Sequence, residues 1–154
     1  MKIECLFVGK TSERYLEDGI ADFHKRLKPY ADVSFKIIRD VKSKASDSEI
    51  KKREGQGILK AVSKDAFLVV LDPRGVKLTS EGLAQQIAGW QEQNRKLVSF
   101  IVGGSNGLST EVQEQADYKL SLSPMTFTHD MTRLILLEQL YRAHSIIAGT
   151  KYHK

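Results

Sequence analysis

The chain has a single cysteine, Cys5, so it cannot form an internal disulfide. Cys5 lies in an apolar run, and we interpret it as a small buried hydrophobic side chain rather than a nucleophile. A lone thiol favours a reducing compartment. No run approaches ~18 apolar residues, which excludes a transmembrane helix, and the apolar N-terminal run is too short for a signal peptide. We therefore expect a cytoplasmic protein without a membrane partner.

The chain also lacks the short motifs of several catalytic classes. It contains no HExxH motif, no His/Cys spacing typical of a metal site and no G-x-S-x-G elbow. The glycine-rich stretch "GGSNG" at 103–107 matches neither the phosphate loop of nucleotide-binding proteins nor the dinucleotide fingerprint. These absences predict no metal cofactor and disfavour an NAD-linked enzyme.

Length and charge set broader limits. The chain has 154 residues, and its composition does not change along its length, which predicts a single domain over residues 1–154. A domain of this size buries roughly 68–70% of the surface that its unfolded chain exposes, so it needs no disulfide or metal to fold. The net charge of +5 permits nucleic-acid binding without requiring it.

Strand-like and helix-like segments alternate along the chain. Short apolar or alternating runs predict strands over 3–9, 33–38, 67–72, 97–104 and 118–122. Helical spacing or capping residues predict helices over 15–27, from Ser48, from Thr79 through Trp90, from near Ser109 and from near His129. This order predicts an α/β fold with a mostly parallel sheet and helices on both faces.

Three of the expected strands end in unusual loops, at 71–77, 103–109 and 121–130. In a parallel sheet these loops lie at one edge, where ligands bind in such folds. The glycines of the second loop permit positive φ and a close approach of ligand to backbone, which favours a ligand contact over a simple turn. Asp72 in the first loop is placed to pair with Arg74.

The third loop carries apolar side chains between exposed backbone groups. Leu122, Met125 and Phe127 would form walls around a flat heteroaromatic ring held by main-chain hydrogen bonds. An equally good interpretation is that the loop fills space in the core. The helix that follows is apolar around much of its circumference, and we expect it to pack on the sheet and on a second copy of the chain in a homodimer.

Three motifs give the chain a family resemblance: "IVGGSNGL", "LSPMTFTHDMTRLILLEQLYRA" and the terminal "YHK". With them the chain resembles the RlmH ribosomal RNA methyltransferases, a minimal group of the SPOUT superfamily, over nearly its whole length. The resemblance implies a homodimer with a C-terminal trefoil knot. It also implies S-adenosylmethionine as co-substrate and methylation of N3 of a pseudouridine in 23S ribosomal RNA of the assembled ribosome.

The resemblance also implies roles for particular residues. The S-adenosylmethionine pocket would consist of Leu71, Gly103, Gly104, Leu122, Ser123, Pro124, Met125, Thr126 and Phe127. The candidates for catalysis are His129, Arg142, Tyr152 and His153: Arg142 would stabilise a ring anion or bind phosphate, while Tyr152 and His153 would position the ring, with His153 as a possible base. Thr128 stands where the family usually has proline.

Two alternatives stay open from the residues alone. The chain could be a non-catalytic α/β module that binds a nucleotide-like ligand or RNA. The tail "GTKYHK" could be a disordered end, since chain termini often are, rather than a lid over cofactor and target base.

Overall fold

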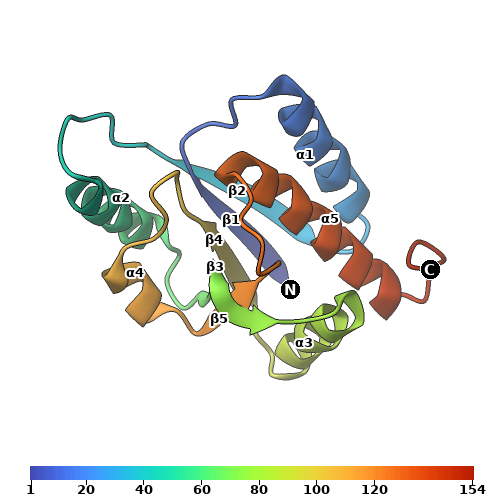
Figure 1. Ribbon diagram of the computed structural model, residues 1–154. Coiled ribbons are helices and arrows are strands. Elements are labelled where there is room, and N and C mark those ends of the chain that lie inside the picture. Colours follow the sequence, from blue (N-terminus) through green and yellow to red (C-terminus); the bar gives the residue numbers. More distant parts are fainter.

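A computed structural model describes all 154 residues, with five strands at its centre. All neighbouring strands are parallel, in the order β2-β1-β4-β3-β5, so their carboxyl ends share one edge (Figure 1). The strands are β1 (Lys2–Val8), β2 (Asp32–Ile38), β3 (Phe67–Lys77), β4 (Leu97–Val102) and β5 (Tyr118–Ser121). The helices are α1 (Arg14–Leu27), α2 (Asp47–Ala61), α3 (Ser80–Glu92), α4 (Thr110–Gln115) and α5 (His129–Ile147).

The helices cover both faces of the sheet, as the alternating sequence pattern predicts. Helices α1, α3 and α5 lie on one face, and α2 and α4 lie on the other (Figure 1). Trp90 is central to the larger core, where its ring packs against Phe67, Phe100 and Tyr118 at centroid distances of 5.3, 6.2 and 5.6 Å. Ile58 and Val112 bring α2 and α4 onto the smaller core of the opposite face.

Four helices begin where a hydroxyl side chain caps them. In each case the side chain accepts a hydrogen bond from the backbone N–H three residues further on, which satisfies a donor that the helix leaves free. The caps are Ser46, Thr79, Ser109 and Thr128. Thr128 therefore has a definite role at the position where the resembling family usually has proline, because it starts α5 with a 3.2 Å bond from the Met131 N–H.

The segment 71–77 is not the loop that the sequence predicted. Strand β3 continues to Lys77, and its pairing with β5 is interrupted only between Leu71 and Val76. A Cβ on Gly75 would lie 2.6 Å from the Lys119 carbonyl oxygen. Glycine at this position therefore lets the backbones of β3 and β5 approach each other just before their pairing resumes. The residues between form a bulge that turns Asp72 and Pro73 toward the carboxyl edge of the sheet.

Helix α5 lies between α1 and α3 within one subunit (Figure 1). Leu134 fills the groove above Gly19 of α1, where an added Cβ would come within 2.9 Å of the leucine Cδ1. Leu136, Leu137 and Leu140 are completely buried in the larger core. Much of the apolar circumference of α5 is thus covered by its own chain, so this helix alone is not a reason to infer a dimer.

Cys5 is completely buried in β1, and burial raises the pKa of its thiol to about 12. It is therefore a core side chain, as the sequence indicated. None of the five helices combines the length and the apolar character that a membrane crossing requires. The trefoil knot implied by the family resemblance stays a prediction.

Candidate active site

A cavity of about 550 Å³ lies at the carboxyl edge of β4, β3 and β5. All three segments that the sequence singled out contribute to its wall, so the predicted convergence is confirmed. The wall consists of Leu71, Asp72, Pro73, Val102, Gly103, Gly104, Ser105, Gly107, Leu108, Gln113, Leu120, Leu122, Ser123, Met125, Thr126, Phe127, Thr128, His129 and Thr132. Eight of the nine expected cofactor-binding residues are among them. The exception is Pro124, an exposed residue of the same loop that does not line the cavity.

The glycines of the second loop permit close packing of backbone against backbone. Of the three glycines in this loop, only Gly107 uses the positive φ that glycine permits, at 79°. A Cβ on Gly103 would lie 2.9 Å from the Gly107 carbonyl carbon. A Cβ on Gly104 would lie 3.2 Å from Val8 Cγ1 and 3.3 Å from Glu54 Oε1. The loop is folded tightly on itself and leaves its backbone facing the cavity.

Two polar side chains of the cavity wall contact each other: Asp72, whose predicted pairing with Arg74 is confirmed, and Gln113, which the sequence did not single out. Gln113 of α4 donates through Nε2 to Asp72 Oδ2 at 2.6 Å, while its own Oε1 is buried without a hydrogen-bond partner. Hydrogen bonds from the Arg74 guanidinium, at 3.0 and 3.1 Å, outweigh burial and hold the pKa of Asp72 at about 2. The wall thus contains an ionised carboxylate and, beneath its surface, an acceptor without a partner.

The third loop supplies apolar side chains to the cavity wall and one exposed side chain at the cavity opening. Leu122 and Phe127 are half-buried, whereas the Met125 side chain is exposed at 73%, the highest value among the large apolar residues. The loop is braced internally, because Ser121 Oγ donates to the Ser123 carbonyl and the Met125 N–H donates to Ser123 Oγ. Met125 is therefore available to close over a bound ligand or against another surface.

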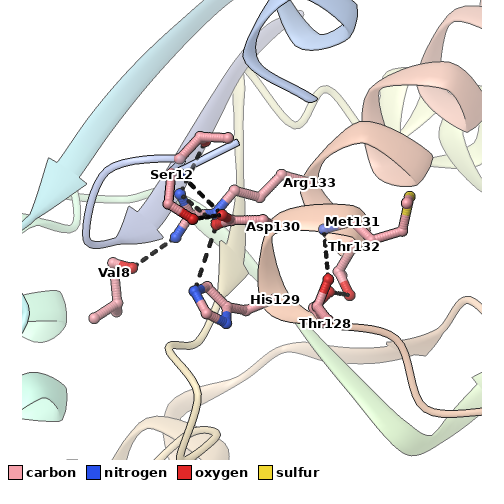
Figure 2. A network of polar contacts seen from close by, with 9 residues as sticks. Val8, Ser12, Thr128, His129, Asp130, Met131, Thr132 and Arg133 are labelled. Carbon is pink, nitrogen blue, oxygen red and sulfur yellow. Dashed lines mark hydrogen bonds and ion pairs between the residues drawn. The ribbon is translucent and has the colours of Figure 1, made fainter. Parts of the chain in front are cut away.

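Beside the cavity, a buried polar network fixes the start of α5 (Figure 2). Asp130 Oδ2 accepts hydrogen bonds from the Ser12 N–H and hydroxyl at 2.9 and 2.8 Å. Arg133, with no exposed surface, donates to the Val8 carbonyl at 2.6 Å and to Thr11 Oγ1 at 3.0 Å. The network joins the segment after β1 to the first turn of α5, which carries His129 at the cavity.

His129 lies against this network, with its Nε2 3.4 Å from Asp130 Oδ1 (Figure 2). Burial raises the pKa of Asp130, but the Ser12 hydrogen bonds and the charges of Arg133 and His129 outweigh it, so this pKa stays below its ordinary value. Asp130 is consequently an anion beside the imidazole ring of His129. A histidine in this position can hold or exchange a proton at the mouth of the cavity.

Glu54 is a further buried carboxyl group behind the glycine loop. Its Oε2 accepts the Val41 N–H at 3.1 Å, and only 6% of the residue is exposed. Burial, and to a smaller extent the charge of Asp40, raise the pKa of Glu54. The hydrogen bond from Val41 and the interaction with His129 lower it by less, so the pKa lies above its ordinary value. Nothing in the local sequence separates Glu54 from its solvated neighbours Lys52 and Arg53, so only its packing reveals it.

The other three catalytic candidates form a separate cluster at the end of α5. Tyr152 donates to Glu138 Oε1 at 3.0 Å, Arg142 Nε donates to the same oxygen at 3.1 Å, and the Arg142 guanidinium lies over the Tyr152 ring. His153 contacts Arg142 through Nδ1 at 3.3 Å and Glu81 of α3 through Nε2 at 2.8 Å. The tail is folded back on α5 and α3, contrary to the disordered alternative.

This tail cluster of Arg142, Tyr152 and His153 does not line the cavity. Arg142 follows His129 by thirteen helical residues, which corresponds to about 20 Å along the axis of α5. Within one subunit, the four catalytic candidates therefore do not meet.

Comparison with known proteins gives the family of the chain. A family model described as "Predicted SPOUT methyltransferase" matches residues 1–153. The chain belongs to the SPOUT methyltransferase family. It is 48% identical to the ribosomal RNA large subunit methyltransferase H of Halothermothrix orenii and 43% identical to the protein of that name from Desulfotalea psychrophila. Each alignment covers 100% of both chains, over 159 and 154 residues.

Solved structures of lower similarity share the fold. A probable methyltransferase from Bordetella pertussis superposes with a TM-score of 0.55 at 8% identity, over 93% of this chain and 96% of that one. A probable methylase family protein from Haemophilus influenzae gives a TM-score of 0.53 at 12% identity, over 96% of this chain and 66% of the other. At these identities the likeness concerns the arrangement of helices and strands alone.

Proposed function

We propose that this SPOUT methyltransferase uses S-adenosylmethionine to methylate large-subunit ribosomal RNA in the cytoplasm, on N3 of a pseudouridine in the assembled ribosome. The observation that carries the proposal is the cavity at the carboxyl edge, whose wall contains eight residues of the family's cofactor motif. The full-length relatives named ribosomal RNA large subunit methyltransferase H support the choice of RNA. The finer choice of pseudouridine N3 rests on the motif resemblance.

The cavity wall fits S-adenosylmethionine, which would supply an electrophilic methyl group on its sulfonium. Leu71, Leu122 and Phe127 offer apolar contact for an adenine ring, and the cavity volume lies within the usual range for small-molecule sites. Asp72 can accept hydrogen bonds from ligand hydroxyl or amino groups, and the buried Oε1 of Gln113 could do so after a side-chain movement that exposes it. A buried acceptor without a partner is costly, so a donor from the ligand would relieve that cost.

The acceptor side requires removal of a weakly acidic N3–H. His129, at the cavity mouth and beside the ionised Asp130, is suited to hold or move this proton or to stabilise negative charge on the ring. Asp130 and Arg133 position His129 by fixing the first turn of α5. The tail cluster would position or stabilise the target ring from a different direction.

We further propose a homodimer in which the tail cluster of one subunit faces the cavity of the other. The separation of about 20 Å along α5 within one subunit supports this arrangement. The exposed Met125 at the cavity mouth and the ordered tail also support the dimer, because each would contact the partner subunit there.

Cofactor binding is tested by titrating the protein with S-adenosylmethionine in a calorimeter. We expect one site per subunit, and Gln113→Met should lower the affinity about 3- to 10-fold, the value of one hydrogen bond. Methylation is tested by mass spectrometry of large-subunit ribosomal RNA from cells lacking the gene. Loss of a methyl-pseudouridine, restored by the purified protein acting on the mutant ribosomes, is the expected result. Cofactor binding without any change in the RNA would favour a non-catalytic module.

The shared site is tested by mixing two inactive variants. Gly104→Val should push the glycine loop off Val8 and Glu54 and so deform the cavity, and Arg142→Ala should disable the tail cluster. After subunit exchange at equal concentrations, half of the dimers are mixed and each holds one intact site, so about one quarter of wild-type activity should return. If the mixture stays inactive although mixed dimers form, cavity and tail act within the same subunit.

A further inference from the structure

The positive charge of the chain is concentrated in one segment. Residues 39–64 contain eight Lys or Arg and four Asp or Glu, a net charge of +4, whereas the whole chain carries +5. The remaining residues are therefore almost neutral overall. The segment comprises the β2–α2 connection, α2 and the residues after it. Such a local excess is the electrostatic pattern of a surface that contacts a polyanion.

The fold gathers part of this charge around a second cavity. The basic cavity, of about 460 Å³, lies beyond the carboxyl end of β2 and is lined by Arg39, Asp40, Val41, Lys42 and Arg53. Arg39 and Lys42 are exposed and form no salt bridge, and Arg53 is paired at 3.1 Å only with the part-exposed Glu49. Three cationic side chains, the Asp40 carboxylate and a single apolar residue therefore surround a concave surface, and the lining carries a net charge of +2 from three cations and one anion.

The basic cavity lies on the same sheet edge as the methyltransferase cavity. Strand β2 is two positions from β4 in the sheet, a separation of about 10 Å. Glu54 connects the two places, because its carboxylate accepts the N–H of Val41 in the basic cavity and lies behind Gly104 in the other wall. The segment of α2 that carries Arg53 is thus packed directly against the cofactor loop.

We propose that the basic cavity binds the phosphate backbone of the RNA strand whose base enters the methyltransferase cavity. This inference rests on the proposed function and adds the place where the RNA backbone is held. Arginine and lysine side chains around a hollow suit phosphate oxygens. A protein partner would require a more apolar and aromatic centre than Val41 provides, so we choose RNA over a ribosomal protein.

The test compares two triple variants with the same change in net charge. Arg39→Gln/Lys42→Gln/Arg53→Gln removes the three cations of the basic cavity. The control, Lys25→Gln/Lys28→Gln/Lys96→Gln, removes three exposed cations that precede β2 and β4 at the opposite edge of the sheet. Both proteins, in full length, are assayed with S-adenosylmethionine and ribosomes from the methylation-deficient strain over a range of salt concentrations.

For the basic-cavity variant we expect KM for ribosomes to rise at least ~10-fold, with kcat and S-adenosylmethionine affinity unchanged. Its plot of log kcat/KM against log salt should flatten by about two units, the contribution of three phosphate contacts on a single strand. The control should stay within about twofold of wild type. Equal effects of the two variants, or none, would overturn the proposal. A wild-type protein that binds cofactor but never methylates ribosomes would instead refute the proposed function.

A cross-link identifies what the basic cavity contacts. A photoreactive amino acid at the exposed Lys44, in the same connection, should join the wild-type chain to large-subunit RNA near the methylated nucleotide. A cross-link to a ribosomal protein alone would overturn the choice of RNA.

Discussion

Arg133→Met should destabilise the protein by about 3 kcal/mol. Arg133 is fully buried, and its Nη1 lies 3.4 Å from Asp130 Oδ1, an oxygen with no hydrogen-bond partner. Removing one member of a buried ion pair costs about 3–5 kcal/mol, because the other charge is left without compensation. The pair is long, which places our value at the lower end of that range. The melting temperature should fall by about 6–12 °C at fixed protein concentration.

A double-mutant cycle isolates the pair from other effects of the substitution. Asp130→Asn keeps an acceptor for Ser12 but removes the charge, so the double variant should be more stable than the sum of single effects predicts, by about 1–3 kcal/mol. Arg53→Met is the matched control, since its partner Glu49 is also one turn away but both side chains are about half exposed. Its cost should stay below about 0.5 kcal/mol.

The network also predicts how stability depends on pH. The pKa of Asp130 in the folded chain lies below its ordinary value, so folding is favoured by the ionised form. This contribution is fully present above the ordinary carboxyl pKa and is lost as pH falls through the folded value. The difference in unfolding free energy between wild type and Asp130→Asn should therefore shrink in acid. Additive single effects in the cycle, or a difference that grows on acidification, would refute our account of the network.

Three other perturbations give separable results. Gly104→Ala should reduce S-adenosylmethionine affinity at least ~10-fold in a folded protein, because its Cβ would press on Val8 and Glu54; unchanged calorimetric affinity would contradict this. The ionised Asp72 stabilises the fold above about pH 4, and wild type loses this contribution as pH falls to about 2. In acid unfolding experiments the difference in unfolding free energy between wild type and Asp72→Asn should therefore shrink over this range. Deleting 152–154 should abolish methyl transfer to ribosomes while cofactor binding survives, and normal turnover would exclude a role of the tail in catalysis.

The sheet and the position of the cavity could be predicted because they follow from local patterns. Continuous apolar runs at 67–72 and 97–104 indicate strands buried on both faces, and parallel strands place their following segments at one edge. The hydroxyl residues three positions before Gly82 and Val112 likewise predict, to within a few residues, where α3 and α4 begin.

The polar details could not be predicted, because they join residues that are distant in sequence. Ser12 and Asp130 are 118 positions apart, and Asp72 and Gln113 are 41 apart. Neither pair leaves a pattern that a window of neighbouring residues contains. The continuation of β3 beyond Asp72 was missed for a related reason: Pro and Gly indicate a turn locally, whereas pairing with β5 resumes beyond the bulge.

The two groups of catalytic candidates give the strongest physical argument for assembly. His129 and the cavity lie at the first turn of α5, while Arg142 stands about 20 Å further along the same rigid helix. The tail folds back only as far as Glu138 and Glu81, and it does not reach the cavity wall. The proposed two-fold contact between identical chains would bring the two groups together at two sites, because a surface that placed one tail at the partner's cavity would also place the partner's tail at its own. A basic cavity beside each methyltransferase cavity would then hold RNA at a site completed by two chains.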